Sequence, residues 1–341
     1  MAAVLRGACA ARPSLSWCLV PWQTTCRGFR RVSKEGSLVP PPARNGLLRP
    51  AESIPGGGRG SAVSLVRPLF FTIGFSGCAF ATASIVQYEV VKHRVNNYLS
   101  DARNAWMERT RPAKSGDFRK QINLWWNSLS EGGRTVAGII AINVLVFGMW
   151  RVPALQSSMM RLFMANPAAK APCLPMILSC FSHYSPMHLA ANMYVLWSFS
   201  HSAVSMFGRE QFLAFYTSAG VTSSFASYVF KTVTGKFTPS LGASGAIMAV
   251  LAAVCTQFPD SKLAIIFLPM IPFTASSALM GIMALDTTGL ILGWKLFDHA
   301  AHLGGALFGI LYAWRGNEVI WLNREPLLRI WHNIRSRGGG S

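Results

Sequence analysis

Long apolar runs separated by short polar stretches dominate the chain from residue 68 onward. A helix that crosses a bilayer needs about 20 predominantly apolar residues. Seven segments approach that length, at 68–87, 135–150, 186–206, 211–230, 241–256, 273–294 and 297–314. The first stands apart from the other six, which follow one another closely. The pattern predicts an all-α polytopic membrane protein, in which one extra helix precedes a six-helix core (1+6).

The same pattern divides the chain into six regions. They are a targeting leader at 1–51, a flexible linker at 52–67, the extra helix at 68–87, a charged connecting segment at 88–134, the core at 135–316 and a basic tail at 317–341. Within the connecting segment, Trp125, Trp126 and Leu129 are expected to form an amphipathic turn at the membrane surface. The apolar stretch at 263–267 is too short to cross a bilayer and is expected to be a connector.

Composition supports a membrane protein. Hydrophobic residues make up 51% of the 341 residues and charged residues only 13%, whereas about a quarter of a soluble domain is charged. The net charge is +19, but the basic residues lie in the N-terminus, the connecting loops and the tail. No basic surface interleaved with aromatic residues emerges, so nucleic-acid binding is not expected. The seven cysteines show neither a metal-ligand spacing nor a disulfide framework, so no metal is expected.

The N-terminus has the composition of an organellar address. Its first fifty residues contain seven arginines and Lys34, but only one acidic residue, Glu35. An Arg-rich, acid-poor start is typical of a mitochondrial transit peptide, and the alternative is a disordered basic tail. Proline and glycine triplets at 40–42 and 56–58 then indicate a flexible stretch without a fold of its own.

A serine and a histidine occur at membrane depth in two different predicted helices. Ser244 begins an apolar helix within segment 241–256, and His302 lies within segment 297–314. A hydroxyl and an imidazole are the two parts of a nucleophile and its general base. Polar groups at bilayer depth are unfavourable and usually have a function or a partner, so this pair is the candidate catalytic site.

Glycines flank both residues. Gly242 frees the backbone just before Ser244, and Gly245 lets another helix approach closely. Gly305 and Gly309 lie four apart and form a small-residue face of the kind that packs helices together in membranes. Close packing of the fifth and seventh segments would bring the serine within reach of the histidine. The Gly-Ala-Ser-Gly order also differs from the Gly-x-Ser-x-Gly elbow of soluble hydrolases.

Other polar residues allow more than one interpretation. His188 and Asn192 lie four apart on one helical face, where they either donate to an oxyanion or tie helices together. Asp298, four residues before His302, would permit a Ser-His-Asp triad, but its position at the membrane boundary favours a solvated carboxylate. Asp286 is expected to pair with a neighbouring helix or to lie near water, and not to be catalytic.

Three motifs, taken in chain order, resemble the rhomboid family of intramembrane serine proteases. They are His188-Leu189-Ala190-Ala191-Asn192, Gly242-Ala243-Ser244-Gly245 and Ala301-His302-Leu303-Gly304-Gly305 with Gly309, and the pair Trp150-Arg151 resembles one in the family's first core loop. The resemblance covers residues 135–314. It implies a Ser244–His302 dyad, with Asn192 and His188 as donors on the oxyanion side. One departure is Met248, because bacterial relatives often have a tyrosine there that stacks on the histidine.

The resemblance also implies a function and a location. We expect a multi-pass protease of the mitochondrial inner membrane that needs no cofactor and cleaves single-pass membrane proteins, with roles in mitochondrial quality control and apoptosis. Its expected surroundings are the lipid bilayer and inner-membrane assembly partners. One alternative is a catalytically inactive rhomboid-like protein that only binds membrane helices. A channel or carrier is the other, although it would more often show charged pore residues or paired broken helices.

Two rules disagree on orientation. The positive-inside rule puts the Lys/Arg-rich segment 88–134 and the tail in the matrix. A matrix-targeting leader instead puts the N-terminus there. We favour the orientation that the leader predicts, because the leader commits the N-terminus to the matrix before the charges of the loops act.

Overall fold

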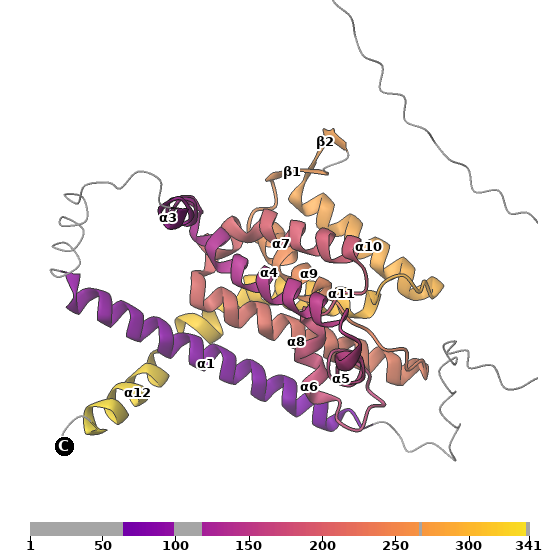
Figure 1. The fold of residues 1–341 in the computed structure, drawn as a ribbon, viewed down its shortest axis with the longest axis horizontal. Helices are drawn as coiled ribbons and strands as arrows, with labels where there is room; N and C mark the ends of the chain where they lie inside the picture. The colour runs from indigo at the N-terminus through magenta and orange to yellow at the C-terminus, as the bar shows by residue number, and fades with distance from the viewer. Residues whose placement is uncertain (1–63, 99–117, 266–267, 339–341) are drawn as a thin grey trace, which may run out of the picture. The chain divides into compact units, whose positions relative to one another are not determined.

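The computed structural model describes residues 64–98, 118–265 and 268–338. Within these ranges the regular secondary structure is helical except for one two-stranded sheet (Figure 1), and an isolated bridge pairs Ala165 with Ser240. The all-α architecture predicted from the sequence is therefore confirmed, with this small sheet as an addition. The predicted leader at 1–51 lies outside the described residues.

In the described part of the chain, each of the seven predicted membrane segments coincides with a helix. These helices are α1 (Val66–Asn96), α4 (Glu131–Met149), α7 (Pro186–Phe207), α8 (Arg209–Thr234), α9 (Ser244–Gln257), α10 (Ala275–Leu292) and α11 (His299–Leu311). The largest differences from the predicted bounds occur at the C-terminal ends of two segments. Helix α1 runs to Asn96 instead of ending at residue 87, and α11 continues into the π-helical segment η3 (Tyr312–Leu322).

Shorter elements fill the connections. Between α4 and α7 lie η1 (Pro153–Leu155), α5 (Gln156–Leu162), α6 (Cys173–Leu178) and η2 (Ser179–Phe181). The connecting segment before α4 contains α3 (Phe118–Ser128), and the basic tail is helical over α12 (Glu325–Gly338). Strands β1 (Lys262–Ile265) and β2 (Leu268–Thr274) pair antiparallel between α9 and α10. Of the expected connector at 263–267, residues 263–265 therefore lie in strand β1, and the other two lie outside the described residues.

Hydropathy differs among the core helices for a structural reason. Helices α1, α4 and α10 are long and apolar enough to cross a membrane, and α9 is apolar but shorter. Helices α7 and α8 are also long, at 22 and 26 residues, but they bury polar side chains, among them Asn192 and Ser200 in α7 and Gln211 and Lys231 in α8. Polar groups that face the bundle interior lower a helix's mean hydropathy without meeting lipid.

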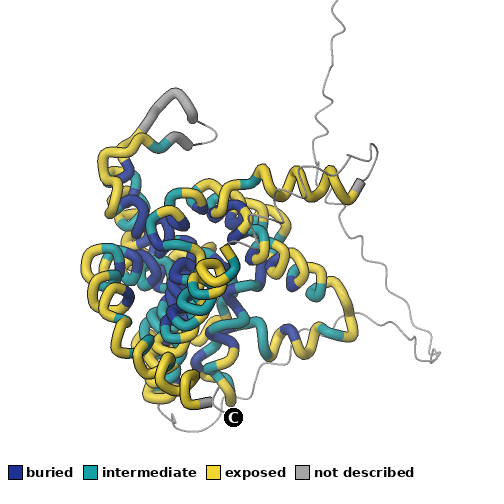
Figure 2. Tube along the Cα trace, turned by 90° about the vertical axis from the view of Figure 1, so that its left-hand side faces the viewer, coloured by how far each residue is buried: buried dark blue, intermediate teal, exposed yellow. Residues whose placement is uncertain are grey.

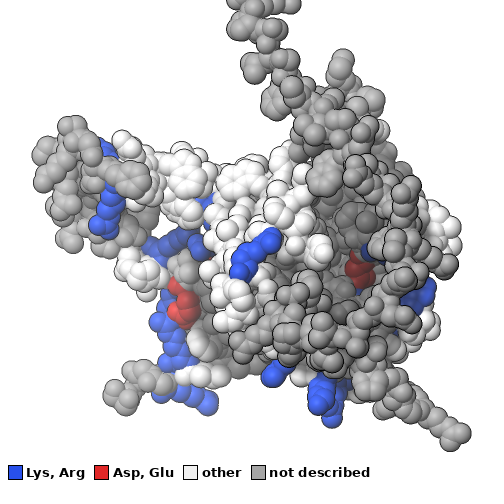
Figure 3. Space-filling model, turned by 45° about the vertical axis from the view of Figure 1, so that its right-hand side comes forward, with Lys and Arg blue, Asp and Glu red and all other residues white. Residues whose placement is uncertain are grey.

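Large apolar side chains cover the outward faces of the helices. Phe70 is 69% exposed, Leu145 65% and Ile291 76%, and Figure 2 shows buried residues concentrated between the helices. Uncharged residues cover most of the described surface in Figure 3. Soluble monomers rarely expose apolar patches this extensive. Contact with lipid explains the pattern, and the chain is a polytopic membrane protein.

Local sequence signals start and stop the helices. Side chains at the N-caps accept a hydrogen bond from the backbone N–H three residues later, at Ser130, Ser185, Thr274 and Asp298. Such caps satisfy donors that have no partner within the helix. Helices α7, α8 and α10 end at glycines with positive φ, namely Gly208, Gly235 and Gly293, a conformation that glycine adopts without steric penalty.

Helix α9 lies at the centre of the bundle, in contact with α7, α8, α10 and α11 (Figure 1). A methyl group added at Gly305 would overlap the carbonyl oxygen of Gly245, and one at Gly309 would overlap that of Ala249. The backbones of α9 and α11 are therefore in direct contact. This close packing holds the first turns of the two helices at a short separation.

Helix α1 packs along α8 and reaches α12 at its far end (Figure 1). Near its middle, Phe80 stacks on Tyr312, with ring centroids 5.3 Å apart. Further along, Glu89 accepts a hydrogen bond of 2.9 Å from Trp331 Nε1 and forms an ion pair with Arg335. The extra helix is thus joined to the core by aromatic packing and to the C-terminal helix by charge.

Candidate active site

Ser244 is the first residue of α9 and follows the turn that contains Gly242. Gly242 has φ +139°, a conformation that L side chains rarely adopt, and its N–H donates to the Ser179 carbonyl at 2.9 Å. The first N–H groups of a helix have no partner within the helix and carry its positive dipole end. The Ser244 hydroxyl therefore lies where negative charge is stabilised.

His302 lies one turn into α11 and faces Ser244. The distance from His302 Nε2 to Ser244 Oγ is 2.8 Å. Neither side chain is fully buried, so both are accessible from outside the helix bundle. This is the geometry in which an imidazole accepts the proton of a serine hydroxyl. The two residues predicted as nucleophile and base thus lie within hydrogen-bond distance.

The other ring nitrogen of His302 faces a carboxylate from α10. Asp286 Oδ1 lies 3.1 Å from His302 Nδ1 and 2.6 Å from His299 Nδ1. Asp286 therefore pairs with a neighbouring helix, as the sequence led us to expect. Its contact with the candidate base was not predicted, and neither was the role of His299. The sequence did contain a signal for His299, because His299 and His302 are three residues apart and therefore share one helical face.

Asp298 serves a different purpose, and the prediction of a solvated carboxylate was wrong. Its Oδ2 pairs with Lys231 Nζ at 3.0 Å and accepts a hydrogen bond from Ser227 at 2.5 Å. Its Oδ1 caps α11 by accepting from the Ala301 N–H at 3.1 Å. A carboxylate that meets a buried ammonium from α8 is neutralised within the protein, so it has no need of water. These contacts direct Asp298 toward α8 and the start of α11.

His188 and Asn192 lie on α7, and His188 approaches the turn that precedes the serine. The Nε2 atom of His188 and Ser244 Oγ lie 3.4 and 3.6 Å from the point where a Cβ of Gly242 would stand. The glycine thus leaves room for both side chains at one place. Asn192 is buried, and its Nδ2 donates to the His188 carbonyl at 2.8 Å. That bond uses one of its two amide hydrogens and leaves the second for another acceptor.

A second histidine supports this side of the site. His183 precedes α7, is 2% exposed, and its ring packs edge-on against His188 with centroids 5.0 Å apart. Burial, with a smaller contribution from His188, lowers the pKa of His183 to about 4. The ring is therefore neutral near pH 7. Nearby, Trp150 Nε1 donates to Ser182 Oγ at 2.7 Å, which ties the loop after α4 to the segment that enters α7.

One group of side chains in the described ranges has the atoms for a metal site. Ligand atoms of Asp286, His299 and His302 lie within 4.8 Å of one another. Tetrahedral zinc, with bonds of about 2.0–2.1 Å, separates its ligand atoms by about 3.3 Å. The 2.6 Å between Asp286 and His299 is shorter than that. Direct hydrogen bonds therefore account for the group without an ion.

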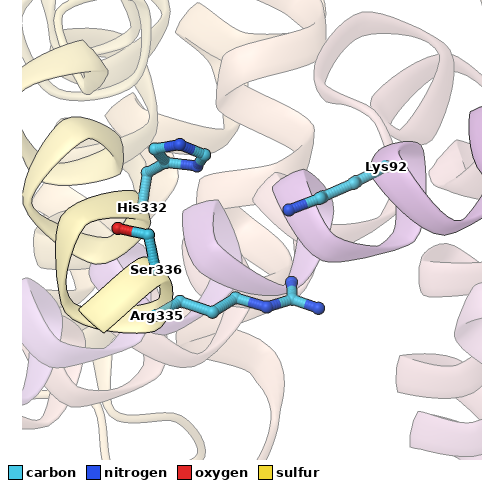
Figure 4. Close-up of a pocket in the computed structure, with 4 residues that line it drawn as sticks. All are labelled: Lys92, His332, Arg335 and Ser336. Carbon is cyan, nitrogen blue, oxygen red and sulfur yellow. The ribbon is translucent and has the colours of Figure 1, made fainter. Parts of the chain in front are cut away.

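A shallow hollow of about 260 Å³ lies elsewhere, between α1 and α12. Lys92, His332, Arg335 and Ser336 line it (Figure 4). None of the predicted site residues contributes to it. Arg335 is already paired with Glu89, so this hollow belongs to the contact between the two helices.

Comparison with known proteins agrees with this geometry. A family model described as a rhomboid domain matches residues 172–318. The Homo sapiens protein named "Presenilin-associated rhomboid-like protein, mitochondrial" is 64% identical over 282 residues, which cover 82% of this chain and 74% of the relative. The Danio rerio "Presenilin-associated rhomboid-like protein A, mitochondrial" is 52% identical, over 81% of this chain and 77% of the relative.

More distant similarity extends to fungi. The Saccharomyces cerevisiae "Rhomboid protein 1, mitochondrial" is 33% identical over 196 residues. That alignment covers 57% of this chain and 56% of the relative.

Proposed function

Because this chain belongs to the rhomboid family, we propose that it is an intramembrane serine protease in which Ser244 is the nucleophile and His302 the general base. The 2.8 Å hydrogen bond between the two, formed within apolar helices, is the observation that carries the proposal. At the coarser level, the chain is a mitochondrial rhomboid-like protease, since a rhomboid domain matches it and its relatives are named as mitochondrial rhomboid or rhomboid-like proteins.

Attack on the substrate needs an exposed peptide carbonyl. A transmembrane substrate must unwind locally, because its helical hydrogen bonds otherwise occupy the backbone groups. Ser244 Oγ then attacks the carbonyl carbon while its proton passes to His302 Nε2. The product of this step is a tetrahedral intermediate with a negatively charged oxygen.

Donors around the serine stabilise that oxyanion. Backbone N–H groups in the first turn of α9 point toward it, and the helix dipole adds to their effect. We assign His188 and Asn192 to the same role. The support is the proximity of His188 to Gly242 and the free amide hydrogen of Asn192.

His302 then returns its proton to the leaving amine, and the peptide bond breaks. The acyl-enzyme that remains is an ester on Ser244. Water, deprotonated by His302, attacks this ester and releases the second product with the serine restored. The protein's own side chains supply every proton transfer in this sequence.

The substrates that fit such a site are single-pass membrane proteins. A helix that enters the bundle from the bilayer meets the half-buried Ser244 and His302 without leaving the membrane. We propose that these substrates belong to the mitochondrial inner membrane, and that their cleavage serves mitochondrial quality control and apoptosis.

Labelling and cleavage together test the proposal. The full chain, purified and reconstituted, is treated with a fluorophosphonate probe for active serines and with a model single-pass substrate. We expect the wild type to be labelled and to cleave, and Ser244→Ala and His302→Ala to do neither. Ser205→Ala is the matched control, because Ser205 is an exposed serine on α7 that bonds its own helix at 2.9 Å.

Cleavage by Ser244→Ala would contradict the serine assignment. A protein that only binds membrane helices would retain the substrate on co-purification, with no labelling and no cleavage by the wild type.

A further inference from the structure

A buried lysine on α8 binds two different segments of the chain. Lys231 is 6% exposed, and its Nζ atom donates to Asp298 Oδ2 at 3.0 Å and to Ser240 Oγ at 2.7 Å. Asp298 caps α11, whereas Ser240 lies in the stretch 235–243 that connects α8 to α9. An ammonium group has three hydrogens, so both bonds can form at once.

The two partners of the lysine are placed alike relative to the candidate catalytic pair. Ser240 precedes Ser244 by four residues, and Asp298 precedes His302 by four. The Asp298 carbonyl also accepts a hydrogen bond from the His302 backbone N–H at 3.1 Å, so the position of this cap sets where the first turn of α11 lies. One ammonium group therefore binds both the segment that leads to the nucleophile and the start of the helix that carries the base.

Ser240 is well placed to control the turn before the nucleophile. Its backbone exchanges two hydrogen bonds with Ala165, at 2.8 and 3.0 Å. Two residues later, the N–H of Gly242 donates to the Ser179 carbonyl, whereas residues 235–239 of the same connection are exposed. A displacement of Ser240 would therefore move the turn at Gly242 and, with it, the first N–H groups of α9.

We propose that Lys231 is a positioning residue, which holds the turn before Ser244 in place relative to the start of α11 and His302. Close packing of α9 against α11 sets the separation of these helices, but the backbone ahead of α9 needs an anchor of its own. The donors that stabilise an oxyanion begin there, and their effect depends on being held in place. Lys231 acts through Ser240 and Asp298 and not on the substrate. This inference rests on the proposed protease function.

Charge neutralisation alone explains only one of the two bonds. The carboxylate of Asp298 offsets the charge of the ammonium whether or not a hydroxyl is nearby. The bond to Ser240 brings no opposite charge, yet it is the shorter of the two. A purely structural ion pair and a positioning residue therefore predict different behaviour for variants of Ser240.

Ser240→Ala in the full chain removes the anchor and leaves the ion pair intact. We expect kcat for a model transmembrane substrate to fall by ~10–10²-fold, a loss that a misplacement of about 1 Å can cause. KM and Tm should change little, because neither the substrate-binding surface nor the buried charges are altered. Ser240→Thr keeps the hydroxyl and should recover most of kcat. Thr238→Ala is the matched control, because it removes an exposed hydroxyl from the same connection, and it should leave kcat and Tm unchanged.

Variants of the ion pair separate positioning from charge. Lys231→Met leaves Asp298 buried without its counter-charge, so both Tm and kcat should fall. Adding Asp298→Asn removes the unpaired charge and should restore part of Tm, while kcat stays low because Ser240 still has no ammonium to bind. Asp298→Asn alone keeps the bond between Lys231 and Ser240, so it should retain most of kcat despite a lower Tm.

The outcomes distinguish this inference from the proposed function. Wild-type kcat in Ser240→Ala, or recovery of kcat in step with Tm in the double variant, would overturn the role of Lys231 if Ser244→Ala is inactive. Cleavage by Ser244→Ala would instead overturn the protease assignment itself. If Lys231→Met fails to fold, the comparison of Ser240→Ala with Ser240→Thr decides the question, because both keep the ion pair.

Discussion

Asn192 of α7 and Asn143 of α4 make the same hydrogen bond. Each side-chain Nδ2 donates to the carbonyl of the residue four positions earlier, at 2.8 Å in both helices. Both side chains are buried. The difference is their location, because Asn192 shares a helical face with His188 and Asn143 lies in α4. Comparing alanine variants of the two residues therefore separates a catalytic contribution from a local structural one.

Asn192→Ala is expected to lower kcat by ~10²–10³, the usual effect of removing one oxyanion donor. The change in unfolding free energy should be about 1 kcal/mol or less, as for other polar contacts between membrane helices. Asn143→Ala is the control and should show a similar change in stability with near-normal turnover. Turnover and Tm are measured on the same detergent-solubilised samples, and parallel behaviour of the two variants would assign Asn192 to packing.

Gly305→Ala is expected to separate α9 from α11. The added methyl group meets the Gly245 carbonyl, so overpacking should reduce the unfolding free energy by about 1–3 kcal/mol and lengthen the contact between Ser244 and His302. We expect labelling by a serine-reactive probe to drop more than Tm alone would explain. Gly281→Ala in α10, where an added methyl group has nothing within 4 Å, is the control and should change neither the labelling nor Tm. Full labelling of Gly305→Ala would contradict the idea that close packing of α9 and α11 holds the site together.

Asp298→Asn is expected to destabilise the protein by about 3 kcal/mol without removing activity. An asparagine still caps α11, but the buried Lys231 loses its counter-charge, which is the main penalty when one member of a buried pair is removed. Adding Lys231→Met should restore part of the loss, because no unpaired charge then remains. Thermal unfolding of the single and double variants measures the coupling, and additive losses would argue against the pair.

Acid is expected to destabilise the protein through His183. The folded state lowers the pKa of His183 to about 4, below the ordinary value of about 6.5, so the unfolded chain binds more protons between these pH values. The stability that comes from the neutral ring is complete above about pH 6.5 and declines as the pH falls toward 4. His183→Gln should flatten this part of the Tm–pH curve. His201→Gln, at an exposed histidine on α7, should leave the curve unchanged.

The positions of the helices followed from the sequence because long apolar runs and capping residues are local signals. Segment 186–206, for example, became α7, with Ser185 accepting from the His188 N–H and Gly208 at its end. The proximity of Ser244 to His302 was also predictable, since glycines at regular spacing allow two helices to pack closely.

What could not be predicted depends on the rotation of one helix against another. Whether Asp286 faces lipid, water or His302 is decided by how α10 turns toward α11, and hydropathy does not report that angle. Asp298 was misjudged for the same reason, because its partner Lys231 lies 67 positions earlier in another helix. The helical tail α12 was missed since its amphipathic pattern is too short and too charged to resemble a membrane span.

The two ends of α1 relate the active site to the sides of the membrane. Near its start, Phe71 and Phe75 pack against a cluster that includes Met176 of α6, in the same loop region whose Ser179 carbonyl binds the turn before Ser244. Near its other end, Glu89 pairs with Arg335 of α12. The site therefore lies toward the end of the bundle where α1 begins, and the C-terminal helix lies toward the other end of α1. If the leader sends the N-terminus into the matrix, the water that completes each hydrolysis is matrix water, and an epitope at the C-terminus reports the compartment across the membrane from it.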